Sequence, residues 1–309
     1  MLFLSACGES EGASKQVVIY TNADEEPVEV MKKVLDDNGY KDKYILQSFG
    51  TSELGGKLMA EGKNSEADLV TMSTYYLTST QKQESLFKEL NLEKKPLSGA
   101  NQYSAPFTVQ EGVIFYNTKV MEENSLSVPT SLKDLANKEY KGMLSISDIT
   151  QSSTAWLLVQ ALVDSYGEKE AKTILKGIYE NAGDHLESSG SGPLKKVRVG
   201  EVALGFGLRH QAIKDKNEGL PIEFVDPSEG TYSLTESLAV IDKGEETNPE
   251  AEKMLQLILD KGREDLLAIY PSPLYEGETV STINAAKNQK VFPEELTAEL
   301  LEEHKKIVE

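Results

Sequence analysis

The fold is decided by residues 16–72, which begin with the run Gln16-Val17-Val18-Ile19-Tyr20, rich in β-branched side chains. Residues 28–35 then carry apolar side chains at helical spacing. Two further runs typical of strands follow, Tyr44-Ile45-Leu46-Gln47-Ser48-Phe49 and Asp68-Leu69-Val70-Thr71-Met72. Strands that alternate with helices at this spacing predict a parallel α/β sheet.

The ligands of such sheets lie beyond the carboxyl ends of the strands. The first candidate loops are therefore residues 21–26, 50–53 and 73–78. A helix that opens at Thr51-Ser52 would direct backbone N–H groups into the same region.

Strand and helix patterns continue to alternate along the rest of the chain, and this alternation predicts a second α/β unit. We expect strands at residues 112–116, 143–147, 201–206, 222–225 and 238–241, and helices at 152–166, 249–261 and 293–304. Pro and Gly interrupt extended runs near residues 105–112 and 226–235, where we expect the domain boundaries.

Composition excludes several classes of function. The 309 residues include 32 Lys plus Arg against 51 Asp plus Glu, a formal charge of −19, which argues against nucleic-acid binding. One Cys excludes an intrachain disulfide or a cysteine-built metal site, and three His leave little for histidine metal chemistry. We expect neither a metal nor a cofactor.

The single Cys, Cys7, follows Leu4-Ser5-Ala6 and precedes a polar run, and this segment resembles a bacterial lipobox. We expect residues 1–14 to be a lipobox remnant and flexible tether with Cys7 lipidated, although the apolar residues 1–4 are shorter than a signal peptide requires. The alternative is a buried or incidental Cys. The resemblance implies a lipid-anchored protein on the extracellular face of the bacterial cytoplasmic membrane, or a periplasmic one.

Several motifs, taken in order, resemble the solute-binding proteins of ABC importers, in the cluster that binds ferric iron, thiamine or aminoethylphosphonate. They are Phe49-Gly50-Thr51-Ser52, Glu66-Ala67-Asp68-Leu69-Val70, Gly112 to Asn117, Asp148 to Ala155, Val199 to Gly205, Pro227-Ser228-Glu229-Gly230, Ala239 to Gly244 and Asn248-Pro249-Glu250-Ala251.

This resemblance implies an α/β, two-lobed periplasmic-binding-protein-like fold (type II), in which two crossing strands join the lobes around a ligand cleft. Lobe 1 would comprise residues 15–107 plus about 231–309 with the C-terminal helices, and lobe 2 residues 108–230. It further implies a monomer that is not an enzyme and that delivers a small molecule to an ABC permease and ATPase.

Arg209 bears on the choice of solute. Ferric-binding relatives carry two adjacent tyrosines where this chain has Leu208 and Arg209. A guanidinium suits bidentate pairing with phosphonate, phosphate or carboxylate and cannot bind a metal. The sequence of residues 204–212 and 229–237 resembles that of the aminoethylphosphonate-binding proteins. The alternative for Arg209 is an ion pair with a nearby acid.

The remaining candidate residues divide by chemistry. For the phosphonate we select hydroxyl groups at helix starts, and for the ammonium we select carboxylates and tyrosines. They are Thr51, Ser52, Ser152, Ser153 and Thr154 for the anion, and Asp24, Glu25, Tyr75, Tyr232 and Glu236, with Glu26, Tyr76 and Glu229 as further options, for the amine. Asn22, in the first candidate loop, is a further ligand-binding candidate. Ordinary N-capping, aromatic packing and surface solvation are the alternatives.

Other functions have less support in the sequence. It has no nucleophile elbow, zinc-protease motif or phosphate loop, and residues 188–193 are interpreted as an ordinary loop. Ferric iron is the main alternative solute, followed by thiamine, sulfate and polyamine-like cations; a surface structural protein is a third class.

Overall fold

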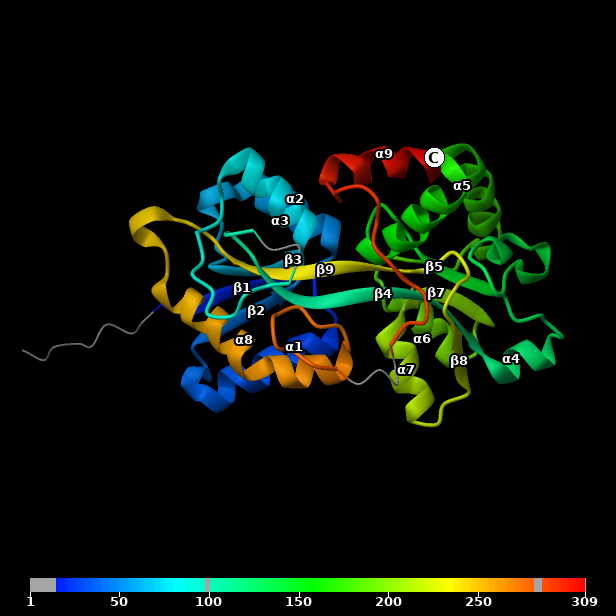
Figure 1. Cartoon of the computed structure of the whole chain (residues 1–309), viewed down its shortest axis with the longest axis horizontal. Coiled ribbons are helices and arrows are strands. Elements are labelled where there is room, and N and C mark those ends of the chain that lie inside the picture. The colour runs from blue at the N-terminus through cyan, green and yellow to red at the C-terminus, as the bar shows by residue number, and fades with distance from the viewer. Residues whose placement is uncertain (1–14, 98–100, 281–284, 309) are drawn as a thin grey trace, which may run out of the picture.

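The structure is a computed structural model that describes residues 15–97, 101–280 and 285–308, and its strands form one curled mixed sheet (Figure 1). The strands are β1 (Val17–Thr21), β2 (Tyr44–Ser48), β3 (Leu69–Ser73), β4 (Ala105–Asn117), β5 (Leu144–Ser147), β6 (Leu186–Glu187), β7 (Leu204–Leu208), β8 (Ile222–Val225), β9 (Thr231–Val240) and β10 (Gln289–Lys290). Their order is β2-β1-β3-β9-β4-β7-β5-β6, with β8 paired to β4 and β10 to β9.

Helices cover the sheet at both ends. They are α1 (Glu25–Leu35), α2 (Thr51–Glu61), α3 (Thr74–Glu84), α4 (Thr118–Glu123), α5 (Ser153–Ala182), α6 (Gly192–Arg198), α7 (Arg209–Asn217), α8 (Pro249–Ile269) and α9 (Ala298–Val308). We call lobe 1 the half with β1–β3, α1–α3 and α8, and lobe 2 the half with β5–β8 and α4–α7; Figure 1 shows them side by side.

Two long strands join the lobes. β4 and β9 pair antiparallel from Ala105↔Leu238 to Glu111↔Ser233, and each also pairs with strands of one lobe. The predicted α/β class is thus confirmed, but each lobe adds one antiparallel crossing strand to its parallel strands. β4 absorbs Pro106 as a register shift and stays extended through residues 105–112, where the sequence predicts a domain boundary.

Each lobe has its own apolar core. In lobe 1, α1 and α8 pack on the sheet around Ile19, Met31 and Leu255, all completely buried. In lobe 2, the first half of α5 packs around Trp156 and Leu162. The apolar residues whose spacing predicted these elements therefore lie on the faces that pack in the two cores.

Three helix ends differ from prediction for local reasons. α8 continues past Gly262 because that glycine packs against Val30 of α1, where a Cβ would lie 3.2 Å from a Val30 methyl. α9 starts later than predicted, since the Thr297 side chain accepts the N–H of Leu300 and caps the helix there. α5 breaks at Gly167, whose φ is +74°, and then resumes to Ala182.

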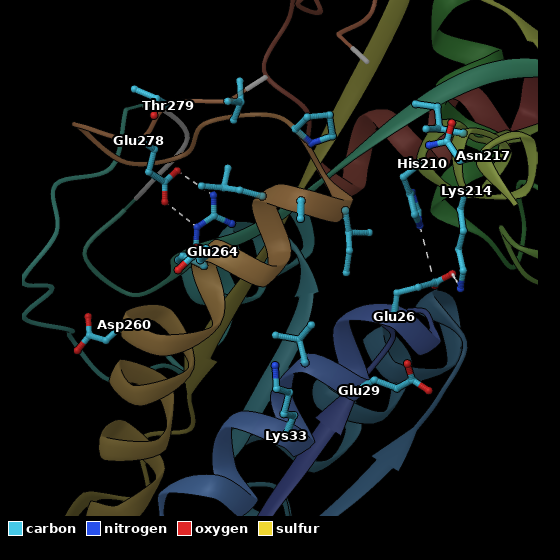
Figure 2. A pocket seen from close by; sticks show the side chains of 18 of the residues that line it. Glu26, Glu29, Lys33, His210, Lys214, Asn217, Asp260, Glu264, Glu278 and Thr279 are labelled. Carbon is cyan, nitrogen blue, oxygen red and sulfur yellow. Dashed lines mark hydrogen bonds and ion pairs between the residues drawn. The ribbon is translucent and has the colours of Figure 1, made fainter. Parts of the chain in front are cut away.

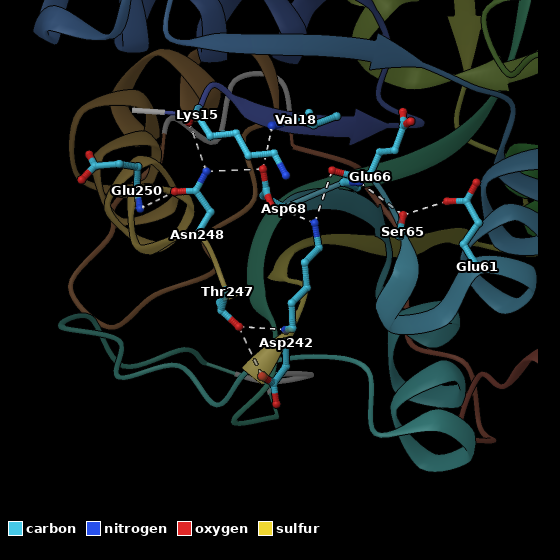
Figure 3. A network of polar contacts seen from close by, with 12 residues as sticks. Lys15, Val18, Glu61, Ser65, Glu66, Asp68, Asp242, Thr247, Asn248 and Glu250 are labelled. Carbon is cyan, nitrogen blue, oxygen red and sulfur yellow. Dashed lines mark hydrogen bonds and ion pairs between the residues drawn. The ribbon is translucent and has the colours of Figure 1, made fainter. Parts of the chain in front are cut away.

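A buried polar network fixes the first strand in lobe 1 (Figure 3). The Asp68 carboxylate accepts the Val18 N–H at 3.0 Å and pairs with the Lys243 ammonium at 2.9 Å. Asn248, which caps the start of α8, lies at the edge of the same network. The entrance of β1, the start of β3 and the region after β9 are thereby held together.

The lobe boundaries stay a prediction. The predicted division at 107/108 falls inside β4 and that at 230/231 at the start of β9. The C-terminal helix α9 contacts α5 of lobe 2 as well as α3 of lobe 1. None of the described helices is both long and apolar enough to cross a membrane.

Candidate ligand-binding site

A small polar cavity lies where both lobes meet the crossing strands. Its volume is about 50 Å³, room for about four water-sized groups. Lobe 1 and the crossing strands contribute Asn22, Asp24, Gly50, Thr51, Gln110 and Glu236, and lobe 2 contributes Gln151, Ser152, Ser153, Thr154, Ser188, Ser189 and Gly190. Among the residues that the structure describes, the lining holds two carboxylates and no lysine or arginine.

The two carboxylates are held in a poorly solvated environment. Burial raises the pKa of Glu236 to about 7, although Ser73 donates to its Oε1 at 2.7 Å. Burial, and then the charges of Glu26 and Glu236, raise the pKa of Asp24 to about 7. A cationic partner would stabilise the ionised form of both carboxylates, because a nearby positive charge lowers the pKa of a carboxyl group.

Polar atoms without partners surround these carboxylates. Asn22 donates to the Thr51 hydroxyl at 3.1 Å, yet its Oδ1 has no hydrogen-bond partner. Within the described part of the chain, Gln110 Oε1 and Glu236 Oε2 likewise lack a hydrogen-bond partner. Since buried polar atoms are normally paired, three such acceptors around one cavity indicate a ligand with hydrogen-bond donors.

The lobe 2 wall is built from the start of α5. Ser152 is the N-cap and accepts the Thr154 N–H at 3.3 Å, so one of its roles is the ordinary capping considered above. Gly190 lies against Thr154 so closely that a Cβ would be 2.1 Å from its Oγ1. The wall thus presents hydroxyls and the positive end of a long helix dipole.

On the lobe 1 side, α2 also begins at the cavity. Its N-cap is Gly50, which has no side chain to satisfy the first N–H groups. Two helix N-termini therefore point toward one small space, an arrangement that favours an anionic group.

The lobes touch on either side of this cavity. Ser52 of α2 donates to the Thr150 carbonyl at 2.8 Å. Glu26 of α1 faces Lys214 Nζ of α7 at 3.8 Å (Figure 2). Gln211 Nε2 of the same helix lies 3.4 Å from the Glu26 carboxylate. His210 lies 4.0 Å from the same carboxylate, and burial lowers the pKa of His210 to about 4. The two lobes are therefore in contact with each other, next to a wider space of about 1,130 Å³ lined by α1, α7 and α8.

A wider opening of about 480 Å³ adjoins the cavity and shares Asp24 and Ser189 with it. Glu25 and Glu26 lie on its lobe 1 side, and the exposed Lys195, Arg198 and Lys214 lie on its lobe 2 side. A third space of about 460 Å³ next to Ser52 leads outward on the α2 side.

Seven of the predicted ligand-binding residues line the cavity: Asn22, Asp24, Thr51, Ser152, Ser153, Thr154 and Glu236. Glu25 and Ser52 lie at its openings. Tyr75 and Tyr232 do not line it, because Tyr75 packs on Trp156 and Tyr232 stacks on Phe292 and donates to Asp164. Cys7 lies outside the described residues.

Arg209 lies away from the cavity, at the start of α7. Its Nε donates to Asp226 Oδ1 at 2.8 Å and its Nη2 to Oδ2 at 3.3 Å, and Glu111 Oε2 lies 3.8 Å from Nη1. The bidentate geometry expected for a phosphonate is thus occupied by a carboxylate of the protein itself. The alternative of an ion pair with a nearby acid describes what the structure contains.

Sequence reasoning missed Gln110, Gln151 and residues 188–190. The Ser/Gly run was interpreted as an ordinary loop, but it lies over the start of α5 and lines the cavity. Its signal was present in the small residues, which allow backbone to approach a ligand. Gln110 was hidden in the middle of β4, because the sequence shows no sign that this strand crosses the cleft.

This geometry agrees with the family to which the chain is similar. A family model described as bacterial extracellular solute-binding protein matches residues 62–294, most of the chain. The chain belongs to this family. Its members are solute-binding proteins rather than enzymes, and they are the substrate-binding components of ABC-type importers.

Individual proteins are more distant. The chain is 24% identical over 275 residues to the spermidine/putrescine-binding periplasmic protein of Salmonella typhimurium, covering 82% of this chain and 77% of the relative. Among solved structures, iron-bound HitA from Pseudomonas aeruginosa matches with a TM-score of 0.76 and 20% identity, covering 95% of this chain and 99% of that one.

The periplasmic binding protein AfuA from Actinobacillus pleuropneumoniae, with fructose-6-phosphate bound, matches with a TM-score of 0.74 and 19% identity over 95% of this chain and 96% of that one. The TM-scores support the two-lobed fold, and identities this low do not identify the solute.

Proposed function

We propose that this solute-binding protein captures a small zwitterion with an ammonium group and a phosphonate group, 2-aminoethylphosphonate being the simplest case. The observation that carries the proposal is the lining of one cavity by the buried Glu236, the half-buried Asp24 and two helix N-termini. The ammonium would lie between Asp24 and Glu236, and the phosphonate at the starts of α2 and α5.

The cavity volume limits how the ligand can lie. About 50 Å³ holds only part of 2-aminoethylphosphonate, so the rest of the ligand would extend into the adjoining 480 Å³ opening. Anion recognition in this proposal comes from backbone N–H groups and hydroxyls, because Arg209 is already paired with Asp226.

A polyamine-like cation is the second candidate. It is favoured by the absence of lysine and arginine from the cavity lining and by the two carboxylates, and a distant relative is named as a spermidine/putrescine-binding protein. A long cation would have to extend from the cavity into the adjoining 480 Å³ opening.

Isothermal titration of the purified protein with 2-aminoethylphosphonate, ethylphosphonate, ethanolamine and putrescine tests these alternatives. We expect 2-aminoethylphosphonate to bind at least about tenfold more tightly than either single-charge analogue, since both ends are recognised. Preference for putrescine would replace the first candidate by the second. Binding of none of the four would contradict both.

Delivery to a membrane permease and attachment through Cys7 complete the proposal. A lipid anchor would be tested by mass spectrometry of the protein from a bacterial host, with Cys7→Ala as the control. A mass without a diacylglyceryl modification at Cys7 in the mature protein would contradict the anchor.

A further inference from the structure

The C-terminal helix α9 lies across the junction of the two lobes, above the crossing strands in Figure 1. At its first turn, the Ala298 N–H donates to Ser79 Oγ of α3 at 3.1 Å. Gln83 of α3 donates to Glu299 at 3.2 Å, and Lys82 lies 3.4 Å from Glu295 just before the helix. The start of α9 is thus attached to lobe 1.

The other end of α9 is attached to lobe 2. Trp156 of α5 donates its indole N–H to His304 Nδ1 at 3.0 Å, and both side chains are buried. Leu301, which is only 2% exposed, belongs to the same core cluster as Trp156. This attachment is buried, whereas Lys82 and Gln83 of α3 are exposed to solvent.

The same tryptophan also contacts lobe 1 directly. The Tyr75 ring, at the start of α3, meets the Trp156 ring edge-on with centroids 4.8 Å apart. Trp156 lies two residues beyond Thr154, which lines the cavity. One aromatic side chain therefore touches lobe 1, lobe 2 and α9 at the edge of the binding site.

We propose that α9 is a strap that fastens the closed arrangement of the lobes, with Tyr75, Trp156 and His304 as its joint. When the lobes separate, the polar contacts with α3 break and Tyr75 leaves Trp156, whereas α9 stays on α5. The polar end releases first because exposed ion pairs and hydrogen bonds are the weaker attachment. The proposal rests on the proposed function only in that a solute drives closure.

Trp156 is the only tryptophan in the sequence, so its fluorescence reports on this joint. The test variant is Ser79→Ala/Gln83→Ala, which removes two partners of α9 and leaves the cavity lining intact. Glu84→Ala is the matched control, because Glu84 is an exposed α3 residue at the end of the same helix. Thermal unfolding followed by circular dichroism checks that each variant is folded.

Two readouts are measured: acrylamide quenching of Trp156 in the ligand-free protein, and the Kd for 2-aminoethylphosphonate. We expect the double variant to show stronger quenching, a Kd raised about 3- to 10-fold, or both, from the loss of two hydrogen bonds. Glu84→Ala should match the wild type in both.

Unchanged quenching together with an unchanged Kd would overturn the strap. If 2-aminoethylphosphonate does not bind the wild type, the proposed function fails, and quenching alone decides the strap. Stronger quenching then supports it, and unchanged quenching overturns it. The two failures are therefore distinguishable.

Discussion

The two walls of the cavity differ in the charge they present. The lobe 1 side, with the crossing strands, carries Asp24 and Glu236, whereas the lobe 2 side carries hydroxyls, amides and the start of α5 without an ionisable lining residue. In the proposed function, formal charge would recognise the cationic end of the ligand and dipoles would recognise its anionic end. Substitutions in one wall should therefore weaken the binding of one end of a zwitterion without affecting the other end.

The largest effect is expected from Glu236→Gln, which removes charge from the lobe 1 wall and preserves its shape. We expect the affinity for 2-aminoethylphosphonate to fall about 100-fold, because the ammonium loses a buried ionic partner. Calorimetry should show no such loss for ethylphosphonate, which lacks the amine.

Glu229→Gln is the control for that substitution. Glu229 is also a buried carboxylate, but its oxygens accept the N–H groups of Leu132 and Lys133 outside the cavity. If Glu236→Gln weakened both ligands equally, the division of labour between the walls would be wrong.

Acidification should weaken the same wall more gradually. The raised pKa values of about 7 mean that Glu236 and Asp24 bind protons as the pH falls below 7, and an ammonium ligand must then displace those protons. Between pH 7 and 6 we expect the affinity to fall about fivefold for each carboxylate.

The measurement is a pH series of Kd values for wild type and Glu236→Gln. The slope should be shallower in the variant, because one of the two titrating groups has been removed. Identical slopes would show that Glu236 does not titrate with ligand binding.

The smallest effect is expected on the lobe 2 wall. Thr154→Val keeps the shape of the side chain but removes one hydroxyl donor, so affinity for any phosphonate should fall about tenfold. Ethylphosphonate and 2-aminoethylphosphonate should lose equally, by calorimetry. Thr173→Val, farther along α5 where the hydroxyl bonds to the Lys169 carbonyl, should have no effect on binding. A loss confined to the amine-bearing ligand would place the ammonium on this wall instead.

Sequence alone predicted the α/β class because strand and helix patterns are local and strong between residues 16 and 72. It also selected most of the cavity lining, since Asn22, Asp24 and Thr51 follow the carboxyl ends of β1 and β2. Loops at strand ends meet at one edge of a sheet, and this follows from the pattern without knowledge of the contacts.

What sequence could not predict was pairing at a distance. Arg209 was the main argument for an anionic solute, yet its partner Asp226 lies 17 residues away on a different element and cannot be identified by spacing. Tyr232 was predicted to contact the ligand amine, but its hydroxyl donates to Asp164 and its ring stacks on Phe292. Such outcomes depend on which surfaces the tertiary fold brings together.

The order of strands also shapes how the chain reaches this structure. β3 and β4 are both neighbours of β9 and do not pair with each other. The inner edge of β3 therefore has no partner until residues up to 240 have joined the fold, whereas β4, β5, β7 and β8 come from one continuous stretch of the chain. Because an unpaired strand edge invites association with other chains, this edge of β3 is the exposed point of a partly folded molecule.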